Sequence, residues 1–158
     1  MSSTSVELTD TFSVIAARYS GTISVIASSI IIFVVFRSHS KLALIYHRIM
    51  FGMSITAIIG SIAIALTTIP MPRNDDSIIH EGIRLGNEST CLVQGLASSF
   101  GMASTFMYNG SLWLNYCCSL AFLMEDNSIR KCVEPFLHFI PIVGGMVVAT
   151  YPFFYAGY

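Results

Sequence analysis

Long stretches without charged side chains alternate with short charged segments along the whole chain. Asp, Glu, Lys and Arg are absent from four stretches: Tyr19–Phe36, Ile49–Pro72, Ser89–Met124 and Pro135–Tyr158. The second stretch has 24 residues, and a helix of that length extends about 36 Å, slightly more than the hydrocarbon core of a bilayer. The pattern predicts an all-α, multi-pass membrane helical bundle, a single transmembrane domain over residues 1–158. Its four transmembrane helices are expected at residues 12–36, 47–70, 91–123 and 135–156.

Composition favours the same class of protein. Of the 158 residues, 54% are apolar and only 11% are charged, against about 25% charged in an ordinary globular domain. A buried helix of a large soluble enzyme would need a polar remainder that this chain lacks. The formal net charge of −1 provides no basic surface for nucleic acid. The first charge-free stretch follows Glu7, Asp10 and Arg18 and exceeds the apolar region of a signal peptide, so it is not expected to be cleaved.

The distribution of Lys and Arg predicts the orientation. The first loop, Arg37–Arg48, carries three basic residues and no acid, whereas only Arg18 precedes the first charge-free stretch. The positive-inside rule therefore places this loop in the cytoplasm and the N-terminus outside, most plausibly at the plasma membrane. The acidic second loop, 73–88, is then expected outside, and the third, 125–134, inside. A glycosylation sequon at Asn87 agrees with an exterior second loop, although such triplets are common by chance and this one lies close to the third span.

Small residues recur at every fourth position within the spans. In the second span they form two series, which are Gly52, Thr56 and Gly60, and Ala57, Ser61 and Ala65. The first span repeats the spacing with Ser20, Ser24 and Ser28, and the fourth with Gly145 and Ala149. Small residues at this spacing let helix backbones approach closely in lipid. They are also simply frequent in membrane helices, but their recurrence in three spans favours a packed bundle over four loosely held anchors.

The third charge-free stretch is longer and more polar than the others. Its 36 residues would extend about 54 Å as one helix, so the helix is expected to tilt or protrude from the bilayer. One face gathers most of its polar and small side chains: Gln94, Ser98, Gly101, Thr105, Tyr108, Asn109, Asn115, Tyr116 and Ser119. Polar groups in lipid are costly unless they face protein or water, which predicts a central helix. The face serves either hydrogen bonds between helices or a ligand cavity, the latter through Gln94, Ser98, Thr105 and Asn109.

The order of short motifs resembles a known superfamily. A basic first loop is followed by YHRIMFGMSI, then PMP, STCLVQG, YNGS and EPFLH. This order resembles helices one to four of the seven-transmembrane G-protein-coupled receptors, nearest the cyclic-AMP-receptor-like and diatom-type receptor-like proteins. The resemblance implies a cell-surface signalling receptor that binds an extracellular ligand and, in a full-length form, a heterotrimeric G protein.

The resemblance transfers only to matching positions. Cys91 corresponds to the cysteine that forms a disulfide to the loop after helix four, and that partner would lie outside this chain. The usual acidic residue of helix two is replaced, since Thr56 and Ala57 stand there, and the Asp-Arg-Tyr motif of helix three is absent, with Asn115-Tyr116-Cys117 in its place. A sodium site in helix two and the familiar activation lock are therefore not expected. The unpaired Cys91 and the polar third helix predict a chain truncated after helix four, lacking helices five to seven.

No catalytic pattern accompanies these features, so an enzyme is not expected. The four histidines are scattered, none at metal-ligand spacing, and no phosphate-binding loop or nucleophile motif occurs, so neither a metal nor a cofactor is expected. Cys117, Cys118 and Cys132 lie toward the cytoplasmic side, where they are either palmitoylated or idle thiols. Two hypotheses remain: a receptor-like protein, or a small four-pass adaptor that binds other membrane proteins. The absence of ionisable residues deep in the spans disfavours a transporter.

Overall fold

The computed structural model describes residues 3–38, 41–66, 69, 87–120, 131 and 133–156. Its elements in chain order are the helix α1 (Ser3–Arg37), the 3-10 turn η1 (Lys41–Ala43), and the helices α2 (Ile45–Leu66), α3 (Glu88–Leu120) and α5 (Glu134–Ala156). No β-strand occurs within these residues. The prediction of an all-α chain is therefore confirmed for the described part, and a helix occupies each of the four predicted spans.

Local sequence explains where the helices begin. At the start of α3, the Asn87 side-chain oxygen accepts a hydrogen bond from the Thr90 amide at 2.9 Å, and the Thr90 hydroxyl accepts one from the Asn87 amide at 2.8 Å. This reciprocal pair satisfies amides that have no partner inside the helix. Helix α5 begins with Glu134 and Pro135, a carboxylate and a fixed φ angle that both suit a first helical turn.

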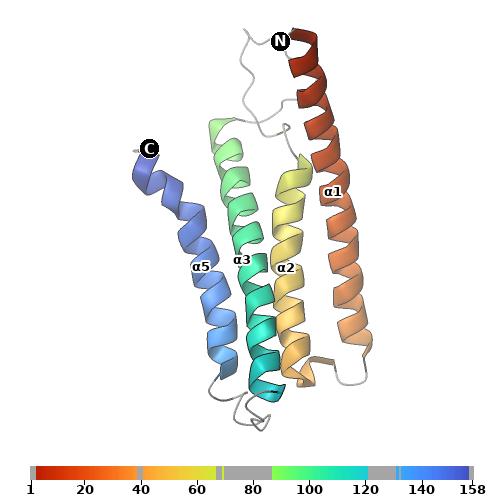
Figure 1. The fold of residues 1–158 in the computed structure, drawn as a ribbon, viewed down its shortest axis with the longest axis vertical. Coiled ribbons are helices and arrows are strands. Elements are labelled where there is room, and N and C mark those ends of the chain that lie inside the picture. Colours follow the sequence, from red (N-terminus) through yellow and green to blue (C-terminus); the bar gives the residue numbers. More distant parts are fainter. Residues whose placement is uncertain are drawn as a thin grey trace.

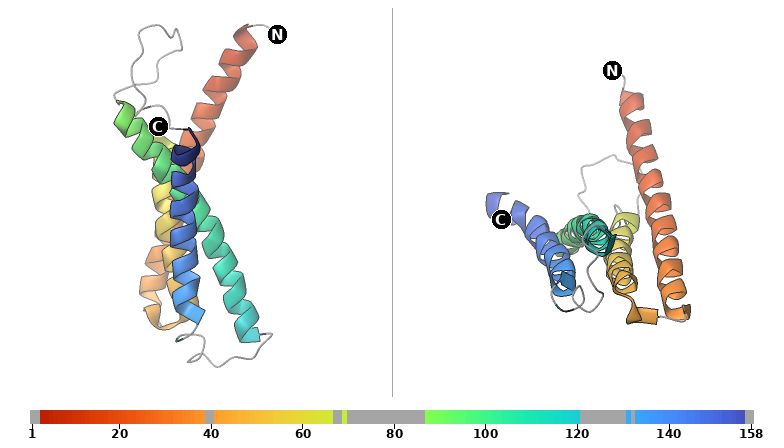
Figure 2. Two further views of the ribbon diagram at one scale, coloured as in Figure 1. Left: turned by 90° about the vertical axis from the view of Figure 1, so that its left-hand side faces the viewer. Right: turned by 60° about the horizontal axis from the view of Figure 1, so that its bottom comes forward.

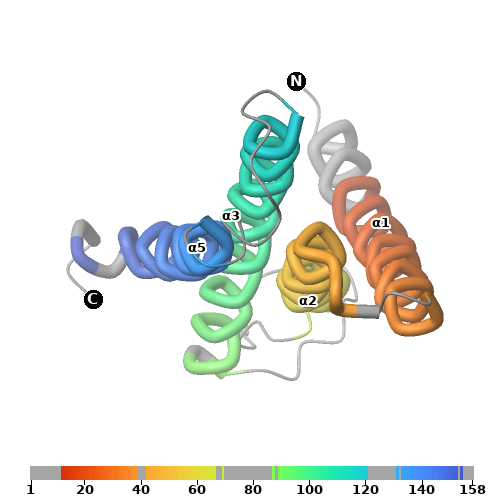
Figure 3. The backbone as a smooth tube through the Cα atoms, turned by 90° about the horizontal axis from the view of Figure 1, so that it is seen from below, coloured from red at the N-terminus to blue at the C-terminus, as the bar shows by residue number. Residues whose placement is uncertain are grey.

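The helices lie in a row in the order α5, α3, α2, α1 (Figure 1). Helix α1 packs against α2, α2 packs against α3, and α3 packs against α5, whereas α2 and α5 touch only slightly. Helices α2 and α3 therefore each have a helix on both sides and form the middle of the row, so α3 shares the central position that its polar sequence predicts with α2. Seen from the side and from below, α3 is tilted relative to its neighbours α2 and α5 (Figure 2, Figure 3).

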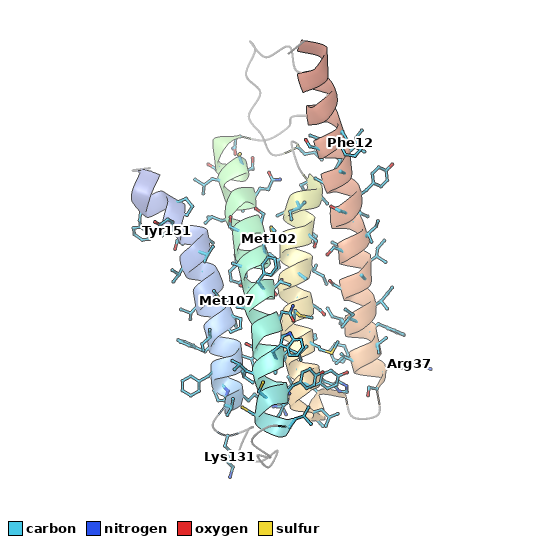
Figure 4. All side chains as sticks on the ribbon, in the orientation of Figure 1. Phe12, Arg37, Met102, Met107, Lys131 and Tyr151 are labelled. Carbon is cyan, nitrogen blue, oxygen red and sulfur yellow. The ribbon has the colours of Figure 1, made fainter. Side chains whose placement is uncertain are left out.

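The helices of the row have two ends, and basic residues mark one of them. Arg37 and Lys131 lie at one end and Phe12 and Tyr151 at the other (Figure 4). We call these the basic end and the N-terminal end. The largest buried apolar cluster, formed by Ile45, Ile49, Tyr108 and Leu137, belongs to the helix segments nearest the basic end. Elsewhere many large apolar side chains are exposed, as is usual for helices that face lipid.

Within the described residues, three helical segments are long and apolar enough to cross a membrane: Phe12–Arg37, Ile45–Leu66 and Glu134–Pro152. By length and composition the chain therefore has the character of a membrane protein. Helix α3 is not among them, since its serine, threonine, asparagine and glutamine side chains lower its hydropathy. A fourth crossing stays a prediction.

Several sequence-based expectations fall outside the described residues. They concern the last residues of the second predicted span (67, 68 and 70) and of the third (121–123), most of the loops 73–88 and 125–134, and Cys132.

Candidate functional site

Helices α2 and α3 approach each other closely where they cross at Gly60 and Gly101. A Cβ atom built on Gly101 would overlap the Cα and N atoms of Gly60 and would lie 2.8 Å from the Thr56 carbonyl oxygen. Both glycines are buried. One turn toward the basic end, the Thr56 and Thr105 hydroxyls are 3.2 Å apart. Two glycines thus bring the backbones together, and a threonine pair bonds across them.

The other small-residue series of α2 faces α1. The Ser61 hydroxyl donates to the Ser24 hydroxyl at 2.7 Å, and a Cβ atom on Gly21 would lie 3.0 Å from the Ala65 Cβ and 2.8 Å from the Ser61 carbonyl oxygen. Helix α2 therefore uses opposite faces for its two neighbours. Gly60 packs against Gly101 of α3, and Ser61 forms a hydrogen bond with Ser24 of α1.

Tyr108 of α3 links α2 to α5. Its ring lies on the backbone notch left by Gly52, where an added Cβ would be 2.9 Å from the ring. Its hydroxyl is 3.3 Å from Nδ1 of His138, and the two rings meet edge to face with centroids 5.7 Å apart. The side chain is 2% exposed, so this polar contact is enclosed by three helices.

An ion pair joins α2 to α5 at the basic end. The Arg48 Nη1 atom lies 2.7 Å from the Glu134 Oε1 atom, and the Arg48 Nε atom donates to the Leu42 carbonyl at 2.6 Å. The side chains of Arg48 and Glu134 are 28% and 10% exposed. One guanidinium therefore ties the first loop, the start of α2 and the start of α5 together, although 86 positions separate the two charged residues.

A groove of about 780 Å³ opens between α2 and α3 at the N-terminal end. From α2 it is lined by aliphatic side chains, and from α3 by the first turns of the helix, including Asn87 and Gln94. The Gln94 amide nitrogen donates to the Ala63 carbonyl at 2.7 Å and so spans the groove between the two helices.

Helix α3 also presents a third face, covered by neither α2 nor α5. Its members are exposed and recur at alternating spacings of four and three: Met102, Phe106, Asn109, Trp113, Tyr116 and Leu120. The Asn109 amide makes no hydrogen bond with the described residues. Phe106 and Trp113 beside it are 72% and 68% exposed. A neutral amide therefore stands among large apolar side chains on the outside of the row.

The four residues predicted to face a ligand cavity lie in four different settings. Gln94 lines the groove, and Thr105 bonds to Thr56 and to its own helix. Ser98 donates to the Gly95 carbonyl at 3.0 Å within α3. Asn109 belongs to the third face. The structure does not gather them around one cavity of the described part, and a shared ligand site stays a prediction.

The remaining predicted sites lie at the start of α3. Asn87, the sequon residue, caps the helix. Cys91 is half-buried in the first turn and has no disulfide within the described residues, where Cys117 and Cys118 are also free thiols. Its predicted partner lies outside the chain, so the pairing stays a prediction.

Sequence reasoning missed two parts of the site. Ser104 and Ser111, which lie outside the predicted polar face of α3, are 0% and 4% exposed, and Ser104 packs against the Gly145 position of α5. The Arg48–Glu134 pair was also missed, although both residues stand in the motifs YHR and EPFLH. The sequence held one signal for each. Ser104 stands four residues before Tyr108 and so shares its helix face, and charged residues such as Arg48 and Glu134 are rare beside the spans.

Within the described residues, no group of three or more His, Cys, Asp or Glu side chains could hold a metal ion. The polar contacts along α3 are neutral amides, hydroxyls and an imidazole. Such groups orient helices and bind uncharged polar ligands.

Comparison with known proteins adds no identification, since no protein family, no curated protein and no solved structure matches the chain.

Proposed function

We propose that this chain is a receptor-like protein of the G-protein-coupled type at the plasma membrane, with its N-terminus outside. In this proposal α1, α2, α3 and α5 correspond to helices one to four of a seven-helix architecture. The observation that carries it is the third face of α3, on which Asn109 lies exposed between Phe106 and Trp113. A helix that is central in a seven-helix receptor needs neighbours on that face as well.

The physical argument rests on the cost of polar groups in lipid. An exposed amide within the hydrocarbon core loses its hydrogen bonds to water, so it is favoured only against protein or a water-filled cavity. The alternation of four and three residues along the third face is the spacing at which one helix packs against another. Further helices on this face would therefore cover its large apolar side chains and leave Asn109 toward an enclosed cavity.

The proposal includes a membrane crossing by α3. This helix lies alongside both α2 and α5, each long and apolar enough to cross. Two of its polar side chains bond to α2 inside the row, Gln94 to the Ala63 carbonyl and Thr105 to Thr56. Ser104, Ser111 and Asn115 are buried in the row. These groups do not face lipid, and the further helices of the proposal would cover Asn109, so low hydropathy does not oppose a crossing.

The test is the water accessibility of position 109 in the native cell. Asn109→Cys is introduced at the native locus in a background in which the four native cysteines are serine. An impermeant methanethiosulfonate reagent is then added from outside. Because only a hydrated thiol forms the reactive thiolate, we expect labelling at least about tenfold faster than at Phe33→Cys on the exposed face of α1.

The adaptor hypothesis makes a different prediction for the same variant. If the third face binds another membrane protein, Asn109→Cys is protected from the reagent and forms crosslinks to that protein. Equal, slow labelling at positions 109 and 33 without any crosslink would contradict both hypotheses. Nucleotide exchange on heterotrimeric G proteins, accelerated by the native-locus gene product and not by residues 1–158 expressed alone, would further support the receptor.

The membrane topology is predicted from the basic residues Arg37 and Lys131 at the basic end of the helices. In the same cysteine-free background, Ser3→Cys and Ser77→Cys should react with an impermeant reagent on intact cells. Ser38→Cys, next to Arg37 at the basic end, should react only after permeabilisation, because basic loops are retained in the cytoplasm. Labelling of Ser38→Cys on intact cells would reverse the proposed orientation.

A further inference from the structure

We draw no further inference here: the strongest candidate, the exposed third face of α3 between Met102 and Leu120, already belongs to the site on which the proposed function rests, and nothing in the structure shows what covers it.

Discussion

Replacing Gly101 by alanine is expected to destabilise the chain more than any other glycine-to-alanine change in α2 or α3. The added methyl group would overlap backbone atoms of Gly60 and lie 2.8 Å from the Thr56 carbonyl oxygen. Backbone atoms cannot rotate away as side chains do, so α2 and α3 must separate. We expect a loss of roughly 3 kcal/mol, seen as a fall of about 10 °C in the unfolding midpoint in nanodiscs.

The same two helices supply graded controls. A Cβ on Gly60 would lie 3.2 Å from the Gly101 backbone, so Gly60→Ala should cost about 1 kcal/mol. Gly95 and Gly110 have nothing within 4 Å of an added Cβ, and alanine there should be neutral or slightly stabilising because it favours the helix. Gly60→Leu should be damaging, whereas the volume-conserving Ile62→Leu should be tolerated. Equal midpoints for Gly101→Ala and Gly95→Ala would contradict the close crossing.

The sequence predicted the helices well because their cause is local. Charge-free stretches of sufficient length select helices in lipid, since the backbone must satisfy its own hydrogen bonds. Small residues at every fourth position were also informative. Gly52, Thr56 and Gly60 lie against α3, while Ser61 and Ala65 lie against α1. Spacing alone could not assign each series to its neighbour, because both series satisfy the same rule.

The polar side chains of α3 were harder to predict because this helix packs on two sides. A single polar face was expected, but Ser104 and Ser111 are buried outside it, and Asn109 of the expected face is exposed. In a helix between two neighbours, a small polar side chain is buried wherever a backbone comes close, as at Gly145. Which neighbour approaches at which residue is a property of the whole row.

The contacts between residues far apart in the sequence could not be predicted, because they too depend on how the whole row is arranged. Tyr108 and His138 are 30 positions apart, and Arg48 and Glu134 are 86 apart. The composition shows only that charges are scarce near the spans. The pairing of Arg48 with Glu134 requires that α2 and α5 begin at the same end of the bundle and that both helices pack against α3.

The ion pair at the basic end is expected to be the most important polar contact between α2 and α5. Arg48→Ala removes the partner of Glu134, whose side chain is 10% exposed, and also the hydrogen bond to the Leu42 carbonyl. A fully buried carboxylate left alone costs about 3–5 kcal/mol. Because Arg48 is 28% exposed, water would partly compensate, and we expect about 2–3 kcal/mol.

The matched control is Arg37→Ala, which also removes one basic residue from the basic end but lies exposed at the end of α1. It should change the unfolding midpoint by less than about 2 °C. The exchanged pair, Arg48→Glu with Glu134→Arg, should recover part of the stability lost in either single variant, since opposite charges again face each other. The recovery is expected to be incomplete because glutamate cannot donate to the Leu42 carbonyl. Additive losses in the double variant would show that Arg48 and Glu134 act independently, and the closure of the basic end would then depend on the apolar contacts of Ile45, Ile49 and Leu137 alone.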